Sequence, residues 1–399
     1  MNFSNEARLA HGGAADGSPT FGLPLVSVIV VNYNYGRFLR QTVDSVFAQN
    51  YPNIECIIVD NASTDDSSEI ITDLAKRYPD IAILRRADNA GLCIAATEGF
   101  ESSTGEYVIF LDADDALLDS CVETHIFVHL SLRIAVGVTS ADMIQVAGTR
   151  VVLGTYLNQT EFMRSGKGVK LDLLRRIDES APELWPLPSP DAALASEVRF
   201  VEPMDANWAW SPTSANCFRR DAVKLFLNKK SLGDLLGCLD SYLLRGISVL
   251  TGSVLIDRPL VFYRIHGSNI FSKHPTLNGV VNFERGGKYD EEQHCRKMLI
   301  NHMIANASSF LRLLPSIDYY MRALGALNDS WPRLCPSGVP CESYLATKIM
   351  AEFDTFAGLI GVAETQSWLA RLGFSRRSLA FAKLRFRVGN ALSRAKKAD

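Results

Sequence analysis

Residues 25–65 read LVSVIVVNYNYGRFLRQTVDSVFAQNYPNIECIIVDNASTD, and they alternate between strand-like and helix-like patterns. Val26–Val31 is a short β-branched run of the kind found in strands buried on both faces. In Gly36–Gln49 the apolar residues recur on one helical face, and Cys56–Val59 is a second strand-like run. A strand, a crossover helix and another strand predict two parallel strands.

The same alternation continues to residue 111. It predicts a helix at Glu69–Tyr78, a strand at Ile81–Leu84, a helix at Leu92–Ser102 and a strand at Tyr107–Leu111. Four strands that alternate with helices indicate an α/β fold with a doubly wound, mostly parallel sheet. In sheets of this kind ligands bind at the carboxyl ends of the strands.

The pattern beyond residue 120 is less regular. A proline-rich stretch at Ala181–Pro190 predicts a loop, and beyond Glu291 the sequence is mostly helical. The other expected elements are a helix at Cys121–Leu132 and strands at Ala135–Val146, Val151–Tyr156, Ser248–Ile256 and Leu260–Tyr263. We therefore expect a C-terminal helical appendage on the α/β fold.

These patterns divide the chain into three predicted regions. Residues 1–24 are a flexible leader, residues 25–285 form the α/β domain, and residues 286–399 form the helical region. Within the α/β domain, residues 25–135 are expected to form one half and residues 136–285 the other.

Composition narrows the class of protein. Of 399 residues, 47% are hydrophobic, which is enough for a large core, and the net charge of −3 argues against a protein that coats nucleic acid. No run reaches the roughly 18–20 apolar residues of a membrane span, and the leader lacks the apolar core of a signal peptide. The eight cysteines form no CxxC pair, so we expect buried thiols in a reducing, cytoplasmic compartment.

Three carboxylates follow the predicted strand Tyr107–Leu111 directly, at Asp112, Asp114 and Asp115. Crowded carboxylates repel one another and raise one another's pKa unless a positive charge lies among them. Mg²⁺ or Mn²⁺ would supply that charge, because hard cations prefer carboxylate and phosphate oxygens. An Asp-rich turn that caps the next helix is the alternative, and the position at a strand's carboxyl end favours the metal site.

Two further strand ends point to the same edge of the sheet. Asn32 and Tyr33 follow the first strand, and Asp60 and Asn61 follow the second. Tyr33 offers a flat ring on which a base can stack, and Asp60 and Asn61 offer polar atoms that can read a base edge. A rim aromatic and an Asx turn are the structural alternatives for these residues.

The stretch 25–65, the Asn89-Ala90-Gly91 turn and GEYVIFLDADD at 105–115 together resemble glycosyltransferase family 2. The resemblance extends over roughly residues 25–135, an ordinary length for one domain. It implies a GT-A-like fold and an inverting transferase that uses a nucleotide-diphosphate sugar and Mn²⁺ or Mg²⁺. It also implies a carbohydrate or lipid-linked acceptor, as in bacterial surface polysaccharide or glycolipid assembly.

The resemblance assigns roles to several of these residues. It implies that Tyr33 stacks on the donor base and that Asp60-Asn61 read it, although the family has a second acid where this chain has Asn61. Asp114 is the implied metal ligand, and Asp112 or Asp115 contacts the donor ribose or sugar. Asn32 and Asn89 belong to the same implied donor site.

A weaker resemblance continues toward the C-terminus. Asn207–Arg220 resembles the acceptor-side strand and loop of the family, and residues 239–245 (LDSYLLR) resemble the segment with the catalytic base. This implies Asp240 as the base, with Asp234 as the second choice, because Leu239 replaces the usual first acid of a doublet. In YRIHGSN at 263–269, Arg264 and His266 are implied diphosphate contacts; a capping or packing role is the alternative for His266.

The last segment, Arg371–Asp399, has nine Lys or Arg residues and one acid. Phe381, Leu384, Val388 and Leu392 share one helical face. A basic amphipathic helix can lie on anionic lipid at the inner face of the membrane. It can equally pack its apolar face on the rest of the protein, and the sequence favours neither.

Two other enzyme classes lack their expected motif here. A sugar nucleotidyltransferase or a dinucleotide dehydrogenase would have a glycine-rich phosphate loop after the first strand, and Asn32–Gly36 is not one. A non-catalytic scaffold on the same fold is the alternative from a different class. It would not need the carboxylates that this chain keeps at Asp112, Asp114, Asp115 and Asp240.

Overall fold

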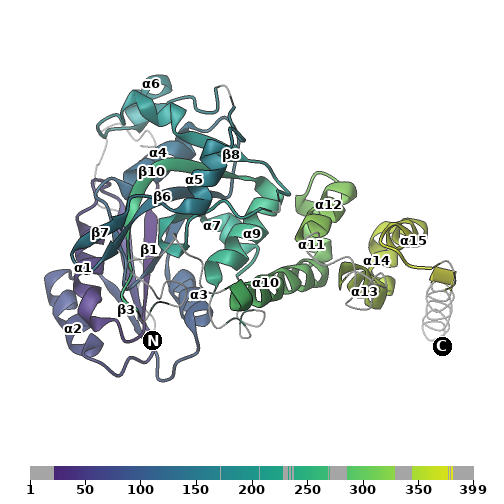
Figure 1. The fold of residues 1–399 in the computed structure, drawn as a ribbon, viewed down its shortest axis with the longest axis horizontal. Coiled ribbons are helices and arrows are strands. Elements are labelled where there is room, and N and C mark those ends of the chain that lie inside the picture. The colour runs from purple at the N-terminus through teal and green to yellow at the C-terminus, as the bar shows by residue number, and fades with distance from the viewer. Residues whose placement is uncertain are drawn as a thin grey trace, which may run out of the picture.

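The computed structural model describes residues 22–170, 172–205, 207–227, 232, 235, 238–267, 269, 285–328, 344–375, 377 and 379–380. A ten-stranded sheet with helices packed on it forms one end of the molecule. Helices α10 to α15 extend from it to one side (Figure 1). The predicted α/β fold with C-terminal helices is confirmed.

The first half of the sheet is parallel and has the strand order β3-β2-β1-β4. Its strands are β1 (Val26–Asn32), β2 (Ile54–Asp60), β3 (Ala82–Arg85) and β4 (Tyr107–Asp112). The register pairs Asn32 with Asp60 and Val31 with Asp112. The carboxyl ends of three strands therefore meet at one edge of the sheet, as the sequence predicts.

Helices cover both faces of this half. They are α1 (Gly36–Phe47), α2 (Ser67–Arg77), α3 (Leu92–Ser102) and α4 (Cys121–Ser131). Alternate residues of β1 enter two cores: Val28 and Val30 share one with α1, α2 and α4, and Ile29 and Val31 share the other with α3. This is why β1 reads as an uninterrupted apolar run.

The second half of the sheet continues from β4 in the order β9-β6-β10-β5. β9 pairs antiparallel with both β4 and β6, β10 is parallel to β6, and β7 and β8 are antiparallel edge partners. These strands are β5 (Ala116–Leu117), β6 (Val138–Ala147), β7 (Arg150–Leu153), β8 (Val198–Val201), β9 (Asn216–Arg219) and β10 (Ser253–Arg264). Because β10 pairs with β5, its last residue, Arg264, lies beside the turn that follows β4.

Two strand predictions in this half are wrong. Residues 248–251 belong to helix α9 (Leu239–Thr251), not to a strand, since their apolar side chains continue the buried helical face of Leu243 and Ile247. Gly252 ends this helix at φ +67, and a Cβ there would collide with Phe200. The runs expected as separate strands are one strand, β10, whose register with β6 shifts around Pro259.

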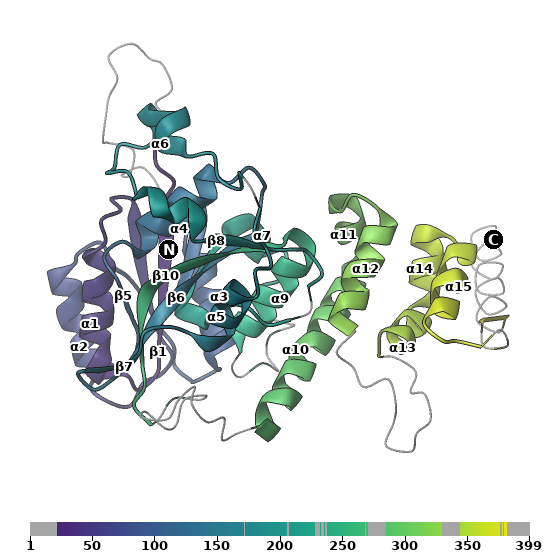
Figure 2. The same cartoon turned by 45° about the horizontal axis from the view of Figure 1, so that its top comes forward.

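The remaining elements connect and extend the sheet (Figure 2). Shorter pieces are α5 (Leu157–Arg164), α6 (Ile177–Ser180), α7 (Arg220–Lys224), and the 3₁₀ turns η1 (Pro182–Leu184), η2 (Ala192–Ser196) and η3 (Thr213–Ala215). The C-terminal helices are α10 (Arg285–Ala305), α11 (Ala307–Leu313), α12 (Ile317–Asn328), α13 (Tyr344–Ala351), α14 (Phe353–Ile360) and α15 (Val362–Arg371). Their apolar side chains share a core with α9.

Several sequence predictions stay predictions. The domain limits at residues 24, 135 and 285 are among them, and so is the cytoplasmic location. Phe381, Leu384, Val388 and Leu392 lie outside the described residues, so the basic amphipathic helix and its membrane contact are also untested. Within the described part of the chain, no helix has both the length and the apolar character that crossing a bilayer requires. The six described cysteines are free thiols.

Helix α4 buries two histidines against the sheet. His125 Nδ1 hydrogen-bonds Thr139 Oγ1 (2.7 Å), and His129 Nε2 donates to the Cys217 carbonyl (3.2 Å). Burial lowers the pKa of His125 to about 3 and that of His129 to about 4. Both rings are therefore neutral in the folded protein at pH values where an unfolded chain, with histidine pKa near ~6.5, binds protons.

This arrangement predicts acid-sensitive folding. Because the histidine pKa values are lower in the folded state, the neutral rings contribute fully to the free energy of unfolding above about pH 6.5. This contribution is lost as the pH falls toward the pKa values of the folded state. At about pH 5 each ring should lower the free energy of unfolding by on the order of 2 kcal/mol. The double variant His125→Asn, His129→Gln keeps the hydrogen-bonding positions but does not titrate. Urea unfolding between pH 7.5 and 5 should show wild type losing stability relative to the variant, and parallel pH profiles would contradict the prediction.

Candidate functional site

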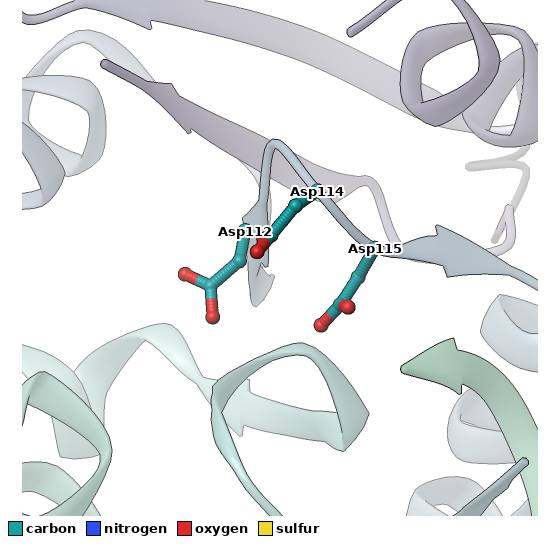
Figure 3. Close-up of side chains that lie close together, drawn as sticks. All are labelled: Asp112, Asp114 and Asp115. Carbon is teal, nitrogen blue, oxygen red and sulfur yellow. The ribbon is translucent and has the colours of Figure 1, made fainter. Parts of the chain in front are cut away.

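The three aspartates at the end of β4 form one cluster. Asp112 is the last residue of β4, and a tight turn follows in which Asp115 N–H donates to the Asp112 carbonyl (3.0 Å). Figure 3 shows the side chains of Asp112, Asp114 and Asp115 extending from this turn to the same side. One carboxylate oxygen from each lies within 4.8 Å of the others. The predicted acidic group is therefore brought together in space.

Neighbouring segments hold this turn in place. The Thr42 hydroxyl in α1 contacts the carbonyls of Ala113 (2.8 Å) and Asp115 (2.6 Å). Both oxygens of the Asp115 carboxylate are also fixed: Ser214 Oγ donates to Oδ2 (2.7 Å), and Arg264 N–H donates to Oδ1 (3.0 Å). Asp115 is 1% exposed, so its carboxylate is a rigid part of the turn.

The electrostatics of the cluster fit a divalent cation. Burial raises the pKa of Asp112 and Asp115 well above the ordinary value, and the Asp114 charge raises both further. The protein therefore holds three carboxylates together without enough positive charge to offset their repulsion. Oxygen ligands at this spacing suit Mg²⁺ or Mn²⁺, which prefer hard carboxylate ligands.

Asp114 is oriented by a histidine from the other half of the sheet. Arg37 Nη2 lies 3.4 Å from His266 Nδ1, and His266 Nε2 lies 2.9 Å from Asp114 Oδ2. A guanidinium can only donate, so in this arrangement Nδ1 accepts from Arg37 and Nε2 donates to Asp114. Asn269 fixes the loop by accepting from His266 N–H (2.8 Å) and donating to the Arg264 carbonyl (2.7 Å).

Arg264 contacts the backbone of the aspartate turn. Its Nη1 donates to the Asp114 carbonyl (2.6 Å), and its Cζ lies 5.3 Å from the centre of the Phe38 ring. The guanidinium thus adds positive charge next to the carboxylates. Its role as a diphosphate contact, like that of His266, stays a prediction.

Sequence reasoning missed three residues from the start of α1. The ring centres of Tyr35 and Phe38 lie 5.4 and 4.9 Å from that of His266, and Arg37 contacts the same imidazole. Burial, with the charge of Asp114, raises the pKa of Tyr35 to about 12. Their position just after the first strand end was the available signal, but only the fold brings residue 266 to them.

The predicted base-binding residues lie together at the ends of β1 and β2. Asn32 Nδ2 donates to Asp60 Oδ1 (3.0 Å), and Asn61 Nδ2 donates to Asn89 Oδ1 (2.8 Å). Tyr33 is 42% exposed at the same edge, so its ring is accessible to a ligand. The structure thus groups these five residues, and their contacts with a donor base stay a prediction.

Thr213 joins the aspartate cluster to Asp240. Its hydroxyl hydrogen-bonds Asp112, and its backbone N–H hydrogen-bonds the Asp240 carboxylate. Burial raises the pKa of Asp240, and its charge contributes to the raised pKa of Asp112. Asp240, in the first turn of α9, therefore lies beside the cluster. Asp234 lies outside the described residues.

Neither Thr213 nor Ser214 was singled out from the sequence. Thr213 is the residue that contacts both acids, and Ser214 bonds Asp115 while accepting from Asp112 N–H (3.2 Å). They occupy η3, just before β9. Small hydroxyl residues in a loop give no distinctive pattern, so only the antiparallel pairing of β9 with β4 explains their position.

The His266–Asp114 contact predicts an effect on metal affinity. His266→Ala should weaken Mn²⁺ binding about tenfold, because Asp114 loses the N–H that orients its carboxylate. Isothermal titration of the full chain with Mn²⁺ would measure this, with the exposed His294→Ala as control. Unchanged binding in His266→Ala would contradict the orienting role, and tighter binding would mean that His266 competes with the metal for Asp114.

Comparisons with known proteins match part of the chain to one family. The family model "Glycosyl transferase family 2" matches residues 27–164. The uncharacterized glycosyltransferase alr2836 of Nostoc sp. is 47% identical over 90 residues, which are 23% of this chain and 28% of the relative. TuaG of Bacillus subtilis, a glycosyltransferase provisionally assigned to teichuronic acid biosynthesis, is 40% identical over 92 residues, 23% of this chain and 36% of that protein. The match therefore spans about a third of either relative's own length.

A solved structure, S. aureus TarS 1-349 in complex with UDP, is similar to 91% of this chain over 88% of its own, at 15% identity and a TM-score of 0.45. A likeness at this level says nothing about the ligands of the present chain. The resemblance rests on the family model, whose match over residues 27–164 contains Asp112, Asp114 and Asp115. Residues 27–164 of this chain therefore resemble the glycosyl transferase family 2 domain.

Proposed function

We propose that this protein is an inverting, metal-dependent glycosyltransferase. It moves a sugar from a nucleotide-diphosphate donor to a hydroxyl of a carbohydrate or lipid-linked acceptor. The observation that carries the proposal is the pair of contacts made by Thr213, which holds the donor-side carboxylate Asp112 and the acceptor-side carboxylate Asp240 together. A role in bacterial surface polysaccharide or glycolipid assembly is supported by the resemblance to TuaG.

The proposed donor site follows the edge of the parallel strands. Tyr33 stacks on the base, while Asp60, Asn61 and Asn89 provide polar atoms for its edge. The diphosphate lies toward Asp114, where Arg264 and His266 can donate to its oxygens. The chemistry supplied there by Mn²⁺ or Mg²⁺, with Asp114 as ligand, is Lewis-acid compensation of the charge on the departing diphosphate.

Asp240 acts on the acceptor in this proposal. Its carboxylate takes the proton of the acceptor hydroxyl as that oxygen bonds to the anomeric carbon. In the same step the bond from that carbon to the diphosphate oxygen breaks, and the electron pair leaves with the diphosphate. A single displacement inverts the anomeric configuration. The raised pKa of Asp240 suits a group that must accept a proton.

The first test is a panel of nucleotide-diphosphate sugars with Mn²⁺, Mg²⁺ or a chelator. One donor should raise the melting temperature of the full chain only when metal is present. Asp114→Asn should abolish that response, because it removes the charge of the proposed ligand without changing its size. Asp318→Asn, on the exposed surface of α12, is the control. If the wild-type protein responds to no donor, a non-catalytic scaffold protein on the same fold would be favoured instead.

The second test separates the base from the donor site. With the donor from the panel and a set of oligosaccharide and lipid-linked acceptors, Asp240→Asn should lower kcat about 10²- to 10⁴-fold. Its donor-induced melting shift should remain, since Asn can still accept the hydrogen bonds from Ser241 and Thr213. If Asp240→Asn retains its rate while Asp234→Asn loses it, the base is Asp234.

A further inference from the structure

A set of alternating charges links helix α9 to the C-terminal helices. Arg245 Nη2 lies 2.8 Å from Glu292 Oε1 in α10, and Arg296 Nη2 lies 3.1 Å from the same oxygen. The side chains of Arg245 and Arg296 are only 5% and 3% exposed. One carboxylate oxygen therefore binds two buried guanidinium groups, which without it would repel each other.

Both ends of this set are anchored. Arg296 Nη1 donates to the carbonyls of Ala326 (3.3 Å) and Leu327 (3.4 Å) at the C-terminal end of α12. Helix C-termini carry partial negative charge, so the positive charge of Arg296 lies between two negative groups, Glu292 and the end of α12. At the other end, the Arg245 charge acts on Asp240, which lies earlier on the same helix, and lowers its pKa against the larger effect of burial.

The Arg245 guanidinium is also fixed by an aromatic ring. Its Cζ lies 5.2 Å from the centre of the Trp208 ring, and Trp208 hydrogen-bonds Tyr156. Trp210 packs edge-on against Trp208, with ring centres 5.3 Å apart. A planar guanidinium held by a ring on one side and a carboxylate on another has little freedom to reorient.

We propose that Glu292 is a positioning residue for transfer: it holds Arg245 on Trp208 and so keeps the Asp240 carboxylate available to the acceptor hydroxyl. The inference rests on the proposed function, since it assumes that Asp240 acts on the acceptor. Without Glu292, Arg245 faces the like charge of Arg296 and turns toward Asp240, a carboxylate whose charge already acts on this guanidinium. An ion pair there withdraws the Asp240 oxygens from the acceptor. The C-terminal helices thereby act on the chemistry of the α/β part.

The test is the kinetics of transfer by full-length variants. Glu292→Gln removes the charge but keeps the shape, and it should lower kcat at least about tenfold, with the donor KM changed less than about twofold. Glu292→Asp restores the charge and should recover part of the lost kcat. The matched control is Asp318→Asn, which breaks another i,i+4 pair, with Arg322 (3.2 Å), at an exposed site.

A second variant separates positioning from stability. Arg296→Met removes the contact with α12 but leaves the Arg245–Glu292 pair, so it should lower the melting temperature while kcat stays within about twofold of wild type. Equal kcat in Glu292→Gln and Asp318→Asn would overturn the positioning role while leaving the proposed function intact. So would equal losses of kcat in Glu292→Gln and Arg296→Met. A wild type that transfers no sugar would overturn both.

Discussion

Mutual repulsion among Asp112, Asp114 and Asp115 is the constraint on which this site depends. Three carboxylates within 4.8 Å are stable only if the surrounding backbone, donors and cations hold them. The chain provides hydroxyl and backbone donors to Asp115, an imidazole N–H to Asp114, and the Arg264 guanidinium against the Asp114 carbonyl. These groups orient the carboxylates without neutralising them. A site built in this way is suited to a divalent cation, which prefers carboxylate oxygens as ligands.

The groups that orient the cluster come from both halves of the sheet. Thr42 belongs to α1 in the parallel half, while Ser214 and Arg264 come from η3 and β10 in the second half. The turn after β4 is therefore where the two halves join. The proposed donor site at the strand ends and the proposed base Asp240 in α9 both lie next to this short segment of backbone. A displacement of either half would change the distance between Asp112 and Asp240, because Thr213 contacts both.

Much of the parallel half could be predicted from sequence because its signals are local. Leu92–Ser102 was predicted with both ends correct, since its boundaries coincide with Gly91 and Ser103. Residues 248–251 were predicted incorrectly because their local sequence signal is ambiguous. A short apolar run satisfies either a strand or a buried helix, and the choice depended on how α9 packs on α10. The same holds for β10, where the two runs expected as separate strands are one strand whose register with β6 shifts around Pro259.

The sequence by itself determined the parallel α/β order, the acidic turn after β4 and the resemblance of residues 27–164 to a known family, because these depend on periodicity and on residues close together in the chain. The tertiary structure alone decided which distant groups meet that turn. His266 reaches Asp114 across 152 positions, and Glu292 reaches Arg245 across 47. Such contacts have no period and no fixed spacing in the chain. They are set by strand register and helix packing, which bring distant residues together only when the whole chain has folded.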